Sequence, residues 1–280
     1  MHKTLTLSRI PARYRGFTLI ELLVVIAIIG ILASMLMPVL GRSKQRAQGV
    51  QCLSNLGQMS LGWQLYASDN TERFPVDASL GDNHATVGQD TINPSWVAGI
   101  LATTTTPDNT NIDKLVGSAY TAFGSIGGYI KNAGVYHCPA DISVDAGNHH
   151  LRVRSISMNS WMSPGKVNQP DSAFWTAPFK KFTSATDFGR TSPVNIFVFV
   201  DERPESINDG WFRISTSGYN RDGSVNASLL NYEDLPAVYH NNASAMSFAD
   251  GHCELHRWQG GNLLDDNDLA WLMTHATVPQ

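Results

Sequence analysis

The most constraining feature of this sequence is an uncharged run of 19 residues that extends from Leu22 to Leu40. As a helix that rises 1.5 Å per residue, the run would be roughly 28 Å long, about the thickness of the hydrocarbon core of a bilayer. Core helices of soluble domains rarely contain an apolar stretch of this length. The run therefore predicts a transmembrane helix near the N-terminus.

The charges that flank this run predict its orientation. Residues 1–16 contain four basic residues and no acidic residue, so the positive-inside rule places them in the cytoplasm and the chain after about residue 42 on the outer side. A secretory signal peptide has a shorter apolar region that is followed by a small-residue cleavage site. That pattern is not met here, and a retained single-span anchor is expected.

One acidic residue, Glu21, lies at the edge of the apolar run, within the string RGFTLIE. A carboxylate at a membrane edge is costly and is usually functional. The string and the run after it resemble the class III leader of type IV prepilins and type II secretion pseudopilins. In that family a prepilin peptidase cuts after the glycine, so the resemblance implies cleavage after Gly16 and methylation of Phe17. The alternative is a chance glutamate beside a simple anchor.

The same resemblance implies a role in assembly for two residues. Glu21 would pair with the α-amino group of a neighbouring subunit in a helical filament, because a buried charge pair is favoured over either charge alone. Pro38 lies where pilins commonly carry a proline, which interrupts a helical hydrogen bond. The implied partners are prepilin peptidase, other pilin or pseudopilin subunits and an inner-membrane assembly platform. The implied location is the inner (cytoplasmic) membrane, with the C-terminal domain in the periplasm.

The helix is expected to continue beyond the membrane, because apolar residues recur on a roughly helical period between residues 42 and 67. These residues are Ala47, Val50, Leu53, Leu56, Leu61, Leu65 and Tyr66. We expect four segments: a leader at 1–16, a transmembrane helix at 17–41, a periplasmic continuation of the helix at 42–70 and a periplasmic domain at 71–280. The expected fold is α+β and pilin-like, with the long N-terminal helix packed on an antiparallel β-sheet that carries long loops.

Two β segments stand out in the periplasmic domain. The β-branched and aromatic run from Val194 to Val200 predicts a central strand. Asp250-Gly251 between two alternating segments predicts a hairpin. As a two-residue loop, it would place Phe248 opposite Cys253 on one face of the hairpin.

The hairpin also carries a spacing that marks a family. His240 is followed by nine residues and then by Asp250-Gly251, which resembles the H-X9-DG region, here residues 240–251, near the C-terminus of many prepilin-type proteins. The segments around Cys52, Tyr136–Pro139 and Phe199–Glu202 resemble the same group. This signature has no established chemistry, so it predicts membership of a family rather than an activity.

Two groups of side chains could carry chemistry. His240, Asp250, His252 and His256, with Asp201 and Glu202, could form a metal cluster or an acid–base pair, although a structural role in the hairpin is the favoured interpretation. Asp265, Asp266 and Asp268 could supply hard oxygen ligands to calcium. An N-cap for the apolar segment that follows is favoured there. Calcium is thus the one cofactor considered, and none is expected.

The three cysteines are expected to be structural. None belongs to a CxxC pair, so a zinc site is not expected. Outside the cytosol two of the three could form a disulfide. The resemblance favours a bond between Cys52 and Cys138, with Cys253 as an unpaired buried thiol that faces Phe248.

These features favour a pilin-like structural subunit, either a pseudopilin or a minor pilin of a type II secretion or type IV pilus-like assembly, rather than an enzyme. Without the leader the chain has 16 basic and 24 acidic residues, so nucleic acid is not an expected partner. No GxSxG, Walker, HExxH or GxGxxG motif occurs in a credible context. The alternatives are a prepilin-anchored envelope module that binds glycans through some of its seven tryptophans and, less favoured, a membrane-anchored hydrolase.

Overall fold

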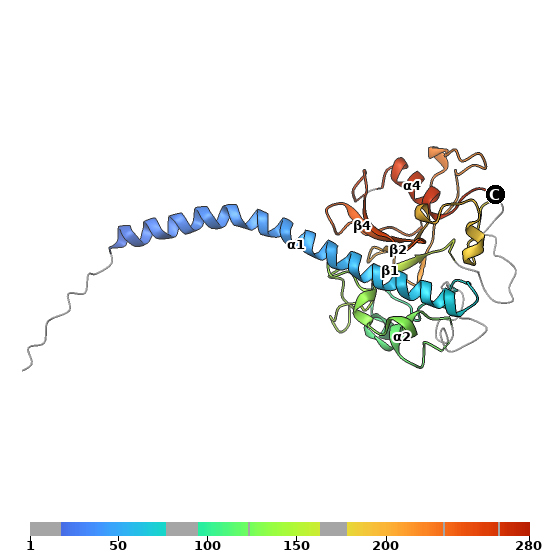
Figure 1. Ribbon diagram of the computed structural model, residues 1–280. Helices are drawn as coiled ribbons and strands as arrows, with labels where there is room; N and C mark the ends of the chain where they lie inside the picture. The colour runs from blue at the N-terminus through green and yellow to red at the C-terminus, as the bar shows by residue number, and fades with distance from the viewer. Residues whose placement is uncertain (1–17, 77–94, 123, 163–177, 232, 263) are drawn as a thin grey trace, which may run out of the picture. The chain divides into compact units, whose positions relative to one another are not determined.

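The computed structural model (Figure 1) describes residues 18–76, 95–122, 124–162, 178–231, 233–262 and 264–280. The expected leader at 1–16, which ends at Gly16, and the expected mature N-terminal residue, Phe17, therefore lie outside the described residues. The chain divides into two compact units, one that ends at Lys44 and one that begins at Gln45.

The first unit contains the beginning of helix α1, which spans Leu19–Asp69. Within the described residues, α1 is the one helix long and apolar enough to cross a membrane, with a mean hydropathy of 2.8 over its most apolar 18 residues. None of that window is buried, so it does not serve as a core helix of this unit. Pro38 lies inside the helix without ending it.

The second unit contains the remainder of α1, which buries a face different from the one predicted. Leu56 is buried and Leu53 is half-buried, but Val50 and Leu61 are exposed, and so are Ala47 and Leu65. The buried face consists of Gly49, Cys52, Asn55, Leu56, Met59, Ser60, Gly62, Trp63 and Ala67. The apolar pattern missed this face because five of its nine residues are glycine, cysteine or polar.

The second unit is built on one five-stranded sheet in the order β3-β1-β2-β4-β5. The strands are β1 (Ile156–Asn159), β2 (Phe197–Asp201), β3 (Trp211–Phe212), β4 (Ala243–Phe248) and β5 (Cys253–Arg257). The predicted central strand is confirmed as β2, which pairs with β1 and β4. The sheet is mixed rather than purely antiparallel, because β3 pairs with β1 in parallel. The α+β organisation with a long N-terminal helix is confirmed.

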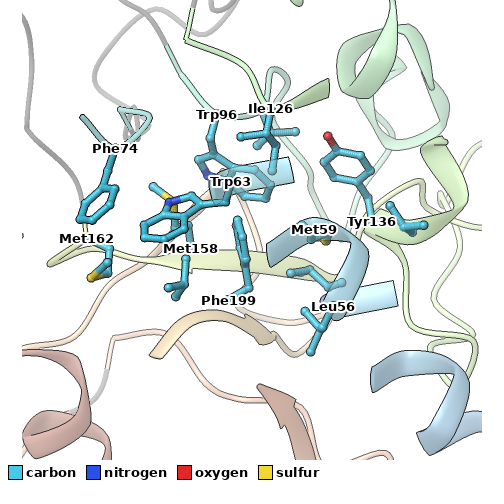
Figure 2. Close-up of a cluster of buried hydrophobic side chains, with 14 of the residues drawn as sticks. Leu56, Met59, Trp63, Phe74, Trp96, Ile126, Tyr136, Met158, Met162 and Phe199 are labelled. Atoms are coloured by element: carbon cyan, nitrogen blue, oxygen red, sulfur yellow. The ribbon is translucent and has the colours of Figure 1, made fainter. Parts of the chain in front are cut away.

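Each face of the sheet is covered by its own hydrophobic core, with α1 on one face and α4 (Asp266–Ala276) on the other. Figure 2 shows the first core, in which Leu56, Met59 and Trp63 of α1 meet Met158 and Phe199 of the sheet. Short helices α2 (Asp113–Val116) and α3 (Gly127–Ile130) complete this layer. On the other face the apolar side chains of α4 pack against β2 and β4.

The β4–β5 hairpin forms as predicted, but its register differs by one residue. Ser247 pairs with Cys253 and Met246 with Glu254, so Cys253 does not face Phe248. The loop has three residues rather than two, since the Phe248 N–H donates to the His252 carbonyl and Gly251 adopts φ +98°. A type I turn followed by a left-handed glycine is a common three-residue alternative to the two-residue loop. Cys253 consequently packs toward the α1 side of the sheet.

Candidate functional site

At the start of α1, Thr18 and Glu21 form a reciprocal cap. The Thr18 N–H donates to Glu21 Oε2 at 2.8 Å, and the Glu21 N–H donates to Thr18 Oγ1 at 3.2 Å. This is a capping box, in which the first and fourth residues satisfy each other's backbone donors. Glu21 is exposed within the chain. Its capping contacts with Thr18 give it a local structural role in addition to any role in assembly.

In the second unit, four potential metal ligands meet at one buried point. Cys52 comes from α1, Cys138 follows a 3₁₀ turn at Ala133–Tyr136, Asp201 ends β2, and His240 precedes β4. The ligand atoms of all four residues lie within 4.8 Å of one another. The first three side chains are fully buried and His240 is 6% exposed. We refer to these four residues as the Cys–Asp–His cluster.

The contacts inside the cluster are short and polar. Cys52 Sγ donates to Asp201 Oδ2 at 2.9 Å, and Cys138 Sγ lies 3.3 Å from His240 Nε2. His240 Nε2 also lies 3.9 Å from Asp201 Oδ2. His240 Nδ1 is buried without a hydrogen-bond partner, so every polar interaction of this imidazole points into the cluster.

Burial shifts the titration of the cluster toward neutral forms. Burial raises the pKa of the Asp201 carboxyl to about 6. Hydrogen bonding to Cys138, together with burial, holds the pKa of the Cys52 thiol well above its ordinary value. Burial lowers the pKa of His240. Without a cation the cluster therefore consists of thiols, a neutral imidazole and a carboxylic acid that ionises reluctantly.

The predicted disulfide is not formed in this structure, in which all three cysteines are free thiols. Cys52 and Cys138 do lie together, as the prediction required, but each sulfur contacts a different polar partner, Asp201 and His240 respectively. The two sulfurs thus lie close to each other, and the disulfide between them stays a prediction.

Of the six residues considered for a metal cluster or acid–base pair, Asp201 and His240 are the two that belong to the Cys–Asp–His cluster. His252 Nδ1 lies 2.6 Å from Asp250 Oδ1 within the hairpin turn. His256 stacks on Trp271 of α4, with 3.6 Å between ring centroids.

Glu202 follows Asp201 but contributes to another buried environment. Its pKa is raised well above the ordinary value by burial and by the nearby charge of Asp234. A carboxyl group of this kind is stable as the neutral acid, and it is not part of the Cys–Asp–His cluster.

The acidic residues before α4 form the predicted helix cap. The Asp265 side chain accepts hydrogen bonds from the Asn267 and Asp268 N–H groups. The Asp268 side chain in turn accepts a hydrogen bond from the Asp265 N–H. Asp268 also accepts from the Gln259 and Gly260 N–H groups, each at 2.8 Å. Two of the three carboxylates are thus engaged by backbone donors, and Asp266 is exposed.

The tryptophans lend little support to glycan stacking. Trp63, Trp96, Trp161, Trp211 and Trp258 are buried, and Trp271 is partly buried against histidine rings. Side chains that stack on sugars need an exposed ring face. In the described part of the chain, these rings serve mainly as core.

Two contacts join the ends of the H-X9-DG spacing to α1. A Cβ built on Gly49 of α1 would lie 3.5 Å from His240 Nδ1, and a Cβ built on Gly251 would lie 2.8 Å from Gln64 Nε2. The helix therefore approaches both ends of residues 240–251 closely. At one end Gly49 of the helix leaves room for His240, and at the other end Gly251 of the turn leaves room for Gln64.

Sequence reasoning missed the Cys–Asp–His cluster because it treated the cysteines and the carboxylate–histidine group separately. The sequence did contain a signal that could have indicated this cluster. Cys52, Cys138 and Asp201 lie in the three segments noted for their resemblance to the same group of proteins, and His240 begins the spacing itself. Side chains that recur in such segments are candidates for one shared site.

The N-terminal part of the chain matches known proteins. The family model of the prokaryotic N-terminal methylation motif matches residues 11–37. The type II secretion system core protein G of Dickeya chrysanthemi is 36% identical over 69 residues, which are 25% of this chain and 45% of that protein. The protein of the same name from Klebsiella pneumoniae is 41% identical over 64 residues, 23% of this chain and 45% of the relative.

These matches are limited to one part of the chain. The core protein G of Escherichia coli K12 is 39% identical over 62 residues, which are 22% of this chain and 43% of the relative. The chain thus spans less than half the length of the curated relatives that it matches, and no solved structure matches it. Together with the exposed apolar helix, the motif identifies a single-pass, membrane-anchored protein that carries the prokaryotic N-terminal methylation motif of the prepilin type.

Proposed function

We propose that this chain is a pilin-like structural subunit, a pseudopilin or minor pilin, of a type II secretion or type IV pilus-like assembly, and not an enzyme. The observation that carries the proposal is the combination of the methylation motif at residues 11–37 with a helix whose most apolar 18-residue window has no buried residue. An apolar surface of this extent needs either lipid or the helices of other subunits to cover it.

The processing steps follow from the prepilin resemblance. Prepilin peptidase would cleave after Gly16 and methylate Phe17, leaving segments 17–41, 42–70 and 71–280 as membrane helix, periplasmic helix and periplasmic domain. The mature chain would lie in the inner membrane, assemble with other subunits into a helical filament and engage an assembly platform. This anchoring and assembly requires no cofactor, and we assign no role in it to calcium.

The decisive measurement is the mature N-terminus. The full chain is expressed in a host with prepilin peptidase, extracted from membranes and digested, and its N-terminal peptide is analysed by mass spectrometry. The proposal expects a peptide that begins with N-methylated Phe17. Gly16→Leu should block processing, because a side chain at this position prevents close approach of the backbone to the peptidase, whereas Gly16→Ala should reduce processing only in part.

Other N-termini would contradict the proposal. A chain that begins at Met1 in this host is a simple anchor, and one that begins beyond Leu40 has lost its helix as an ordinary signal peptide. A correctly processed chain that forms no crosslinked multimers in membranes would instead support the envelope-module alternative, in which the prepilin anchor holds a monomeric domain.

A further inference from the structure

We propose that Cys52, Cys138, Asp201 and His240 form a structural zinc site, with one Zn²⁺ ion bound by two thiolates, one carboxylate oxygen and one imidazole nitrogen. The site belongs to the folded domain and is separate from the cleavage and assembly functions proposed above. Its evidence is the convergence of four ligand atoms of suitable chemistry from four separate segments of the chain.

The spacing of the ligand atoms fits a tetrahedral ion. Zinc bonds of roughly 2.0–2.3 Å to oxygen, nitrogen and sulfur place neighbouring ligand atoms of a tetrahedron about 3.3–3.8 Å apart. The Cys52–Asp201, Cys138–His240 and His240–Asp201 atom pairs lie 2.9, 3.3 and 3.9 Å apart, and no pair exceeds 4.8 Å. Side-chain adjustments of less than about 1 Å would bring them to ligating positions.

The types of ligand select the metal. Two sulfurs and one imidazole favour a borderline-soft ion such as zinc over calcium or magnesium, which prefer oxygen ligands. Binding releases the protons of the two thiols to solvent, because thiolates are the ligating species. The bound ion with two thiolates and one carboxylate has a net charge of −1, no greater than that of an ionised Asp201 alone.

The surroundings favour a structural site. Catalytic zinc sites keep a position open for water, whereas structural sites use four protein ligands. Here four ligands are present, and none is more than 6% exposed. The described geometry leaves no ligand facing solvent, so the ion would hold α1 to the ends of β2 and β4 and to the Cys138 segment.

Two other arrangements of the same atoms compete with this one. A Cys52–Cys138 disulfide would remove the thiol contacts of Asp201 and His240 and leave both buried groups less well satisfied, which is unfavourable. Two free thiols that act only as hydrogen-bonding groups would preserve the contacts but would give no reason for a histidine and a carboxylate to converge on them.

The test uses the full chain, purified in detergent with a reductant that does not bind metal, loaded with Zn²⁺ and passed over a desalting column. We expect one zinc per chain by elemental analysis. Cys52→Ser, Cys138→Ser and His240→Ala should each lower zinc affinity more than about a hundredfold, beyond the loss typical of removing an outer-shell partner. Cys253→Ser is the matched control, since Cys253 lies in β5 outside the cluster, and it should retain the wild-type stoichiometry.

A second measurement does not depend on variants that fold. Co²⁺ added to wild-type protein should produce visible bands typical of tetrahedral coordination and thiolate charge-transfer absorption, and stoichiometric Zn²⁺ should abolish both. Absence of these bands together with substoichiometric zinc would overturn the proposal. The proposal would also be overturned if Cys253→Ser reduced zinc retention as much as Cys52→Ser does. A third contrary result would be a Cys52–Cys138 disulfide, found by peptide mapping in protein that was exported to the periplasm and purified without reductant. None of these outcomes changes the N-terminal peptide, so the proposal and the prepilin function fail separately.

Discussion

Thr18 and Glu21 cap the start of helix α1 reciprocally, with hydrogen bonds of 2.8 and 3.2 Å between the backbone N–H of each residue and the side-chain oxygen of the other. Glu21 thus combines a local structural role with the assembly role that the prepilin resemblance implies. Because glutamine can replace glutamate in a capping box, the two roles can be separated by mutation.

We predict that Glu21→Gln leaves membrane insertion and leader cleavage intact and weakens assembly. Insertion is driven by the apolar run, which the substitution makes more favourable. In an assembled filament the α-amino group of a neighbour would lose its counter-ion, which should weaken the subunit contact by about a hundredfold or more. Crosslinking in membranes, with cleavage monitored in the same samples, measures the loss of multimers.

Thr18→Ala is the matched control for this experiment. It removes one half of the cap and keeps the charge of Glu21, so multimers should persist. If Glu21→Gln gives the wild-type ladder, Glu21 does not set subunit register, and a processed but monomeric envelope anchor becomes the better account.

A second prediction compares two glycines of α1. A Cβ on Gly57 meets no atom within 4 Å, whereas a Cβ on Gly62 would lie 2.6 Å from Ile130 Cγ1 in α3. Gly57→Ala should therefore raise the free energy of unfolding by about 0.5–1 kcal/mol, through helix propensity. Gly62→Ala should lower it by about 1–3 kcal/mol, because the packed layer must shift to admit the methyl group.

Chemical denaturation of the full chain in detergent, followed by the near-ultraviolet signal of the buried tryptophans, measures both values. Equal effects of the two substitutions would show that α1 does not dock on α3 as closely as the structure has it.

A third prediction concerns the cap of α4. Asp265→Ala should cost about 1 kcal/mol, the usual value for an N-cap. Asp268→Ala should cost more, about 2–3 kcal/mol, because this buried carboxylate satisfies backbone donors of Gln259, Gly260 and Asp265. Asp266→Ala should change stability by less than about 1 kcal/mol.

Thermal unfolding with and without Ca²⁺ completes this test. The cap interpretation expects no calcium-dependent rise in the melting temperature. A rise that Asp266→Ala abolishes would show that the three aspartates bind calcium after all.

A fourth prediction concerns acid stability. Burial, together with the nearby His275, lowers the pKa of His256 to about 4. Between about pH 4 and 6.5 the unfolded chain binds more protons at this residue than the folded chain, so its contribution to stability falls as the pH is lowered through this window, by at most about 3 kcal/mol. His256→Phe keeps an aromatic ring on Trp271 and should lessen this loss.

The comparison is made as a difference between the variant and the wild type at each pH. Asp201 acts with the opposite sign, because its pKa is raised to about 6 by burial, and it contributes equally to both proteins. Denaturation profiles of the two proteins that run parallel from pH 4 to 7 would contradict the assignment to His256.

The sequence predicted the elements whose signal is local. The apolar run, the capping aspartates and the central strand β2 each depend on residues that are neighbours in the chain, and each was confirmed. The hairpin was predicted as an element but its register was not, because Asp-Gly fits both a two-residue loop and the second half of a three-residue loop, and only the contact with the rest of the fold selects one.

The features that failed are those that depend on tertiary packing. The buried face of α1 is set by small and polar residues such as Gly49 and Ser60, which fit closely under other elements but have no hydrophobic signal. The Cys–Asp–His cluster joins residues separated by 39 to 188 positions in the chain, and no spacing rule covers such distances. The parallel pairing of β3 with β1 likewise has no local signature, since β3 is only two residues long.

The close approach of α1 to both ends of residues 240–251 constrains the path of that stretch. Gly49 and Gln64, which meet His240 and Gly251, are 15 residues apart on the helix, about 22 Å along its axis. The strand between His240 and Gly251 has to cover the same distance while it presents alternate side chains to the two cores. One added residue would turn part of β4 over, moving Met246 toward α1 and Ala245 toward α4. The nine-residue interval therefore suits the spacing of these two contacts on α1, which gives it a structural reason that is independent of any chemistry at His240.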